Sequence, residues 1–191
     1  MVVNKKIVNN YKNYGVALLR NVVSSDWLKK LAKGIEKNFQ NPSQYKCIYE
    51  EENGKEIFYD DYCNWQRIEE YKDFIFNSDI AKIAAQLMQS RKVNLFHEHI
   101  LIKEPGATKR TPWHQDQPYY CVDGKDNCSL WIPLDKISKE VCPEFVKFSH
   151  NWNKKYLPTK FFGHTYEKKD DEFENIPDIS NNLNDYEIAS W

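Results

Sequence analysis

The sequence predicts an α+β fold with a barrel or sandwich of short strands as its core, and two changes of pattern along the chain support this. In the first ninety residues, apolar side chains recur at helical spacing in the segments 24–40 and 77–90. From residue 92 onward, short segments alternate polar and apolar residues between turn signals, as half-buried strands do. Helices followed by a run of strands are typical of an α+β architecture.

Length and composition bound the class of protein. A chain of 191 residues is long enough for one domain, predicted to cover residues 1–191. The net charge of -1 gives no indication of a nucleic-acid or membrane partner, and it leaves the oligomeric state open. No apolar run approaches the roughly 20 residues of a membrane-spanning helix, and the N-terminus lacks the apolar core of a signal peptide. Five cysteines without CxxC spacing predict reduced thiols and a cytoplasmic location.

The first half of the chain predicts three helices and a strand. Residues 4–13 are polar and form a short helix, and the apolar run "GVALLRNVV" (15–23) is expected to be a strand. The segment "SSDWLKKLAKGIEKNFQ" predicts a helix capped by Ser24 or Ser25. Residues 41–66 show little periodicity, and 77–90 predict a second amphipathic helix with Ser78 as its cap.

The second half predicts strands. These are "KVNLFHEHILIKEPG", which ends at a Pro-Gly turn, then the extended "TPWHQDQPYY", then "CSLWIPLDKI" and "EFVKFSHNW". Residues 153–186 are polar and rich in Asp and Asn, which predicts a long surface loop. The last residues, "YEIASW", have the pattern of a strand that is just beginning.

Two residues of "TPWHQDQPYY" carry a possible metal site. In an extended segment, residues i and i+2 point to the same side, so His114 and Asp116 would present an imidazole and a carboxylate together while Gln115 faces away. These are two of the three ligands of the facial triad that binds non-haem iron in oxygenases. The H-x-D pair by itself is weak support, since about one chain in three of this composition would contain it by chance.

The surroundings of this pair resemble the phytanoyl-CoA dioxygenase family of Fe(II)/2-oxoglutarate-dependent oxygenases. The resemblance rests on "KEPG", "TPWHQDQPYY", "SLWIPLD" and, more loosely, "EFVKFSHNW", in that order over residues 92–152. The N-terminal "YGVALLRNVVSSDWLKKL" is similar to the opening of the family. The resemblance implies a double-stranded β-helix, a jelly-roll or cupin-like core with the N-terminal helices packed outside.

The resemblance also implies a site. Iron(II) would be the metal and 2-oxoglutarate the co-substrate, which is cleaved to succinate and carbon dioxide as a substrate C–H bond is hydroxylated. His114 and Asp116 match the first two metal ligands and would be the catalytic residues. Trp131 matches a position expected to line the co-substrate pocket, Ser129 would share its face by strand alternation, and Lys103 could meet a co-substrate carboxylate. Core packing for Trp131 and a solvated strand end for Lys103 stay open as alternatives.

The family closes its triad with a second, distal histidine, followed by an arginine that binds 2-oxoglutarate. Both are expected beyond Trp191, so the domain is predicted to be incomplete, with its closing strands missing. His164 is a remote substitute, and His150 matches a family position that is not a ligand. His97 and His99 alternate on one strand, where packing explains them better than zinc does.

Three hypotheses follow for the chain. It is an iron- and 2-oxoglutarate-dependent oxygenase of a small-molecule or acyl substrate, or a catalytically inactive scaffold of the same fold, or a cupin-like protein that binds a metal or a small molecule. A fold and a partial triad do not select the substrate, because the pocket lining does so.

Overall fold

The computed structural model describes residues 3–50, 57–105, 110–160 and 172–191. Packing within the chain defines two compact units. Unit 1 comprises Met1–Val3, Leu19–Lys109 and Leu130–Lys136, and unit 2 comprises Asn4–Leu18, Arg110–Ser129 and Ile137–Trp191. The single domain predicted over residues 1–191 stays a prediction, because a compact unit is defined by packing and a domain by independent folding.

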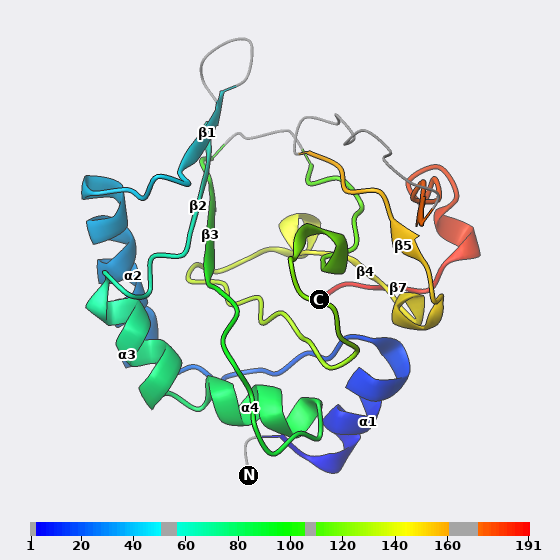
Figure 1. The fold of residues 1–191 in the computed structure, drawn as a ribbon, viewed down its shortest axis with the longest axis horizontal. Coiled ribbons are helices and arrows are strands. Elements are labelled where there is room, and N and C mark those ends of the chain that lie inside the picture. The colour runs from blue at the N-terminus through cyan, green and yellow to red at the C-terminus, as the bar shows by residue number, and fades with distance from the viewer. Residues whose placement is uncertain (1–2, 51–56, 106–109, 161–171) are drawn as a thin grey trace. The chain divides into compact units, whose positions relative to one another are not determined.

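Unit 1 contains a three-stranded antiparallel sheet in the order β1-β2-β3 (Figure 1). The strands are β1 (Cys47–Glu50), β2 (Ile57–Tyr62) and β3 (His99–Lys103). Phe58 of β2 is paired with Tyr49 of β1 on one side and with Lys103 of β3 on the other. The register therefore places Lys103 in a row with two aromatic rings, and its ammonium lies 5.4 Å from the centre of the Phe58 ring.

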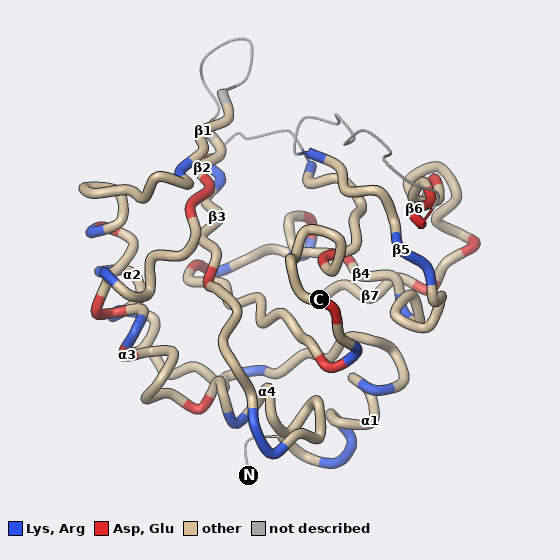
Figure 2. The backbone as a smooth tube through the Cα atoms, in the orientation of Figure 1, with Lys and Arg blue, Asp and Glu red and all other residues tan. Residues whose placement is uncertain are grey.

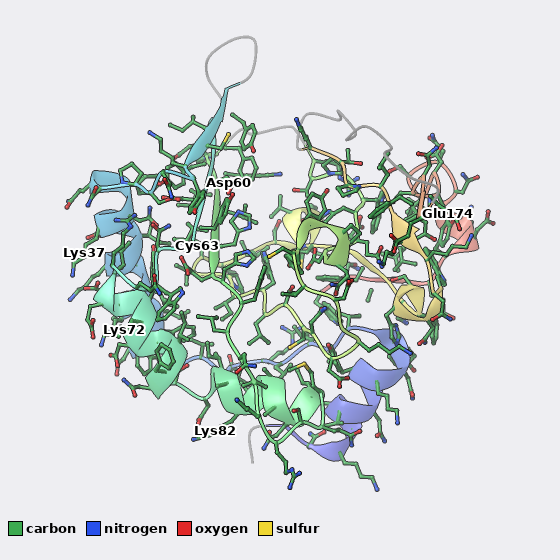
Figure 3. All side chains as sticks on the ribbon, in the orientation of Figure 1. Lys37, Asp60, Cys63, Lys72, Lys82 and Glu174 are labelled. Carbon is green, nitrogen blue, oxygen red and sulfur yellow. The ribbon has the colours of Figure 1, made fainter. Side chains whose placement is uncertain are left out.

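Three helices accompany this sheet: α2 (Ser25–Gln40), α3 (Glu69–Asn77) and α4 (Ile80–Leu87). The predicted cap Ser24 accepts a hydrogen bond from the backbone N–H of Trp27 at 3.3 Å. Helix α2 lies close to α3 at Gly34, where a Cβ atom would come within 2.5 Å of the Tyr71 ring. Lys37 and Lys72 lie on the sides of α2 and α3 that are turned away from the sheet (Figure 3).

A buried polar cluster joins α2 to the sheet in unit 1. The Asp61 side chain is fully buried and accepts hydrogen bonds from the amide of Asn38 at 2.6 Å, the hydroxyl of Tyr59 at 3.2 Å and the backbone N–H of Ser43 at 3.0 Å. The Ser43 hydroxyl and the backbone N–H of Tyr62 donate to its other oxygen. Burial alone would raise the pKa of Asp61, but these hydrogen bonds outweigh burial and lower it to about 2.

Unit 2 begins with helix α1 (Lys5–Tyr14), which Asn4 caps by accepting a hydrogen bond from the backbone N–H of Ile7. The helix ends at Gly15, whose φ of 79° lies in the left-handed region. A Cβ atom at Gly15 would approach the His150 ring to 2.5 Å, and His150 Nε2 donates to the carbonyl of Lys12 at 3.1 Å. His150 therefore has a structural role at the end of α1, in agreement with the expectation that it is not a metal ligand.

The rest of unit 2 is made of short elements. The strands are β4 (Phe145–Val146), β5 (Lys155–Tyr156), β6 (Phe173–Glu174) and β7 (Ile188–Ala189). The single-turn helices are η1 (Gln117–Tyr119), η2 (Lys139–Val141), η3 (Ser149–Asn151) and η4 (Leu183–Asp185). Strand β7 pairs antiparallel with β4, and β6 pairs parallel with β5. The strands expected in "EFVKFSHNW" and "YEIASW" are thus present as a pair.

Two of the predicted strands outside the segment of His114 and Asp116 are wrong. Residues 15–23 have no strand, because the chain leaves α1 through a left-handed glycine and Asn21 also has a positive φ, of 58°. Residues 128–137 have no strand either, although the polar and apolar residues alternate there. A strand requires a partner for its backbone groups, and alternation does not supply one.

Charge and cysteine chemistry agree with the composition. Lysine and arginine are interspersed with aspartate and glutamate along the chain rather than collected in one segment (Figure 2). All five cysteines lie in described residues and none is in a disulfide. Within the ranges that the structure describes, no helix is both long and apolar enough to cross a membrane.

Candidate metal centre

The segment that carries His114 and Asp116 belongs to unit 2. It pairs with no neighbouring strand, so the strand predicted here is wrong. Pro112 and Pro118 cannot donate backbone hydrogen bonds, and Asp116 (φ -67°, ψ -41°) already turns the chain into η1. Side-chain hydrogen bonds, instead of strand pairing, hold this segment in position. The amide of Gln115 donates to the carbonyl of Lys154 at 3.2 Å and accepts from the N–H of Tyr156 at 3.0 Å.

The structure brings the imidazole of His114 and the carboxylate of Asp116 together. His114 Nε2 lies 3.2 Å from Asp116 Oδ1, and the two side chains are 36% and 47% exposed. Gln115, between them, is engaged with β5. The side chains of these three residues therefore alternate as expected: His114 and Asp116 share one side and Gln115 is on the other, although the segment is not a strand.

The other ring nitrogen of His114 has a fixed partner. Nδ1 lies 2.8 Å from the carbonyl oxygen of Pro112, which can only accept, so Nδ1 carries a proton. In the neutral imidazole, Nε2 then holds the free lone pair that a metal needs. A ligand histidine whose second ring nitrogen donates to a backbone carbonyl is the usual arrangement at protein metal sites.

The second oxygen of Asp116 is also engaged. Ser129 Oγ donates to Asp116 Oδ2 at 2.8 Å, which leaves Oδ1 facing His114. The hydrogen bond with Asp116 raises the pKa of His114 above its ordinary value, and burial opposes this rise. The same hydrogen bond lowers the pKa of Asp116, and the bond from Ser129 adds to that decrease. A proton on Nε2 and a metal ion would therefore compete for the space between Nε2 and Oδ1.

Two tyrosines that the sequence reasoning did not assign lie beside this pair. The Tyr119 ring meets the His114 ring edge-on, at 5.8 Å between centres and 89° between planes. Its hydroxyl donates to the carbonyl of Thr159 at 2.6 Å and accepts from the N–H of the same residue at 2.8 Å. The Tyr120 hydroxyl lies 3.4 Å from Ser129 Oγ. Both tyrosines lie within four residues of the H-x-D pair, at the end of η1, and this proximity in the sequence could have identified them.

The donor set fits a divalent metal in part. His114 Nε2 and Asp116 Oδ1 lie 3.2 Å apart, close enough for one ion to contact both atoms. Imidazole with carboxylate suits iron(II). However, the described residues include no group of three His, Cys, Asp or Glu side chains that could hold a metal ion.

The remaining histidines do not complete the set within the described chain. His164, the remote substitute, lies outside the described residues. His99 Nε2 is hydrogen-bonded to the carboxylate of Asp60 on the sheet of unit 1, and its ring lies 6.2 Å from that of His97. This agrees with the preference for strand packing over a zinc site.

Two of the five predicted site residues belong to unit 1, and three belong to unit 2. Lys103 ends β3 with its ammonium over the Phe58 ring. Trp131 is 48% exposed and lies outside any strand. Ser129 was expected to face a co-substrate together with Trp131, and the structure places its hydroxyl on Asp116.

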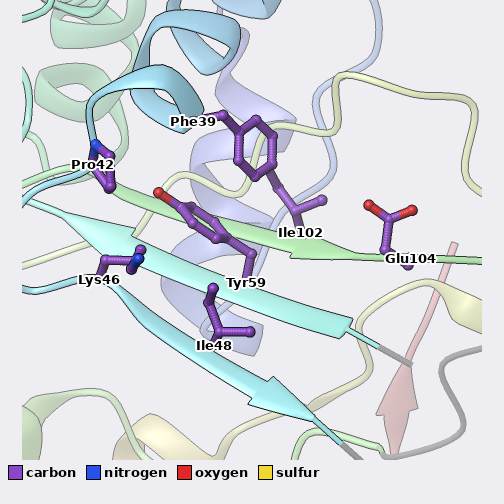
Figure 4. Close-up of a pocket in the computed structure, with 7 residues that line it drawn as sticks. All are labelled: Phe39, Pro42, Lys46, Ile48, Tyr59, Ile102 and Glu104. Atoms are coloured by element: carbon purple, nitrogen blue, oxygen red, sulfur yellow. The ribbon is translucent and has the colours of Figure 1, made fainter. Parts of the chain in front are cut away.

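A pocket in unit 1 is unrelated to these residues. It has a volume of about 240 Å³ and lies against the sheet beside the end of α2 (Figure 4). Its lining consists of Phe39, Pro42, Lys46, Ile48, Tyr59, Ile102 and Glu104. The lining includes none of the predicted site residues, so this pocket gives no support for their role.

Comparison with known proteins gives one match. A family model described as phytanoyl-CoA dioxygenase (PhyH) matches residues 11–189. A search of curated proteins and a search of solved structures each gave no match.

Proposed function

Because this chain belongs to the phytanoyl-CoA dioxygenase family, we propose that it is a non-haem Fe(II)/2-oxoglutarate-dependent oxygenase that hydroxylates a small-molecule or acyl substrate. The observation that carries the proposal is the free pair of ligand atoms in unit 2. Nε2 of His114 and Oδ1 of Asp116 face each other at 3.2 Å, and the other polar atom of each side chain already has a partner.

The roles of the residues follow from this geometry. His114 and Asp116 would bind iron(II) through Nε2 and Oδ1. With the metal, 2-oxoglutarate and dioxygen bound, such a centre supplies C–H hydroxylation, and 2-oxoglutarate is decarboxylated to succinate. The Tyr119 ring would fix the plane of the imidazole. Lys103 and Trp131, which belong to unit 1, stay predictions from the sequence as co-substrate contacts.

The mixed helix-and-sheet architecture is consistent with the cupin-like fold of the family. We propose that the fold is a double-stranded β-helix. The antiparallel pairing of β4 with β7, which lie more than forty residues apart in the chain, supports this, because such a fold pairs strands that are distant in sequence. We also propose a small-molecule substrate and a cytoplasmic location, the latter because all five cysteines are thiols.

The direct test is metal binding by the 191-residue chain. Purified protein would be loaded with iron(II) without oxygen, desalted and assayed for iron by elemental analysis. Asp116→Ala should abolish iron retention, because the remaining imidazole provides one bond and no negative charge. Asp123→Ala, at an exposed acid of the same unit, serves as the control and should leave retention unchanged. Equal iron content in Asp116→Ala and the wild type would refute the site.

A second candidate function is a metal- or small-molecule-binding protein without turnover. The observation that favours it is the two-ligand set, since the described residues provide no third metal ligand. Release of succinate from 2-oxoglutarate separates the two functions. Iron-dependent succinate formation that Asp116→Ala eliminates supports the oxygenase, and iron retention without succinate supports the binding protein.

A further inference from the structure

We propose that Ser129 is a positioning residue that makes Asp116 a one-oxygen metal ligand. This inference rests on the proposed function and concerns a residue for which the family resemblance implied only a shared face with Trp131. Ser129 lies thirteen residues after Asp116, beyond the turn "DGKD", and its hydroxyl donates to Asp116 Oδ2 at 2.8 Å.

In this hydrogen bond the Ser129 hydroxyl is the donor and the Asp116 carboxylate is the acceptor. A carboxylate oxygen accepts hydrogen bonds, and Ser129 Oγ is the donor to Asp116 Oδ2 at 2.8 Å. The single hydrogen of the Ser129 hydroxyl therefore points to Oδ2. The Tyr120 hydroxyl lies 3.4 Å from Ser129 Oγ and is also within reach of the Asp116 carboxylate.

The two oxygens of Asp116 therefore have different roles: Oδ2 accepts from Ser129, and Oδ1 faces His114. A carboxylate can bind a metal through one oxygen or through both. With Oδ2 held by Ser129, only Oδ1 is directed at His114 Nε2. One-oxygen binding keeps more positions open for a bidentate co-substrate than two-oxygen binding does, and open positions are what iron(II) oxygenases require.

The metal partner of Asp116 has the same kind of support. His114 Nδ1 is held by the Pro112 carbonyl at 2.8 Å, so each of the two ligands has one atom fixed by the protein and one left for the metal. Loss of such a supporting hydrogen bond typically reduces metal affinity by about 10–100-fold.

The experiment uses the full 191-residue chain and Co(II) as the probe, since its visible absorption reports both affinity and coordination. The decisive pair is Ser129→Thr and Ser129→Val, because threonine and valine have nearly the same shape and only threonine keeps the hydroxyl. Ser129→Thr should bind Co(II) as the wild type does. Ser129→Val should bind about 10–100-fold more weakly, with a shifted absorption band. Tyr120→Phe, which leaves the Ser129 bond to Asp116 intact, should weaken binding less than Ser129→Val does.

Each other outcome overturns a specific statement. Equal affinity and equal spectra for the threonine and valine variants refute the positioning role and leave the metal site intact. Equal loss in both variants also refutes it, since the hydroxyl would then not be the cause. Thermal melting identifies any variant that fails to fold, and the spectral shift of folded protein decides between a coordination effect and a packing effect. A wild-type chain that binds no Co(II) removes the metal centre itself, and this inference with it.

Discussion

Asp61 in unit 1 and Asp116 in unit 2 are both carboxylates with lowered pKa values and hydroxyl donors, yet they have opposite roles. Asp61 is fully buried, and donors from the backbone and from side chains saturate both of its oxygens. Asp116 is half exposed, its Oδ2 accepts from Ser129, and its Oδ1 faces the imidazole of His114. A lowered carboxylate pKa is therefore common to a structural centre and to a candidate ligand. Exposure, together with an oxygen that faces a histidine, distinguishes the candidate ligand from the structural carboxylate.

The largest effect that tests this contrast is on stability. Asp61→Ala leaves the buried amide of Asn38, the hydroxyl of Tyr59 and the N–H of Ser43 without an acceptor. We expect it to reduce the free energy of unfolding by about 3–5 kcal/mol, measured by urea denaturation. Asp26→Ala is the control, because Asp26 is 91% exposed and its ion pair with Lys29 at 3.7 Å contributes at most about 1 kcal/mol. A loss of less than about 1 kcal/mol in Asp61→Ala would show that the buried cluster is dispensable.

The next effect is the pH dependence of stability. A carboxyl with a pKa of about 2 in the folded protein and about 3.9 in the unfolded chain stabilises the fold above the unfolded value. This contribution, about 2 kcal/mol, should disappear as the pH falls from about 5 to 2. Chemical denaturation at a series of pH values should show the decrease for the wild type and a smaller one for Asp61→Asn. Parallel curves for the two proteins would assign the acid sensitivity to other groups.

A smaller effect is expected from the residue that anchors the site segment. Gln115→Leu removes the partners of the Lys154 carbonyl and the Tyr156 N–H. We expect a destabilisation of about 1–3 kcal/mol in urea. Gln66→Leu, at an exposed turn of unit 1, is a matched control and should change stability little. If the two variants are equally stable, the segment is held by contacts other than this amide.

The smallest effect is a change of titration at His114. Its hydrogen bond with Asp116 raises its pKa, so in metal-free protein the ring should keep its proton to a higher pH than an unpaired histidine does. NMR titration of the ring protons would measure this, and Asp116→Asn should move the midpoint to lower pH. An unchanged midpoint would mean that the 3.2 Å contact is not maintained in solution.

The sequence predicted the helices of this chain better than its strands, for physical reasons. Helix α2 has its cap, Ser24, and its apolar stripe within one segment, so local information was sufficient. Strands β1 and β2 were not predicted because their stability comes from pairing with each other and with β3. Residues 128–137 show the opposite failure: they have the alternation of a strand and no pairing partner among the described residues.

The sequence predicted the two candidate ligands of the site. It did not predict the hydrogen bonds that hold these ligands in position. His114 and Asp116 are two residues apart, so their common side follows from backbone geometry alone. Ser129 and the carbonyl of Pro112 support them through hydrogen bonds that depend on where the chain returns. The sequence placed Ser129 by strand alternation beside Trp131. Because the segment is not a strand, its hydroxyl was free to meet Asp116.

In the segment 113–116, odd-numbered and even-numbered residues have different roles. The odd-numbered residues hold the chain: the indole of Trp113 donates to Ser180 Oγ at 3.2 Å, and Gln115 is bonded to β5. The even-numbered residues, His114 and Asp116, are the proposed metal ligands. Substitutions at even positions can therefore change which ion binds while the chain path is retained. Insertion of a single residue would exchange anchor and ligand at every following position, so this stretch should accept point mutations far more readily than changes of length.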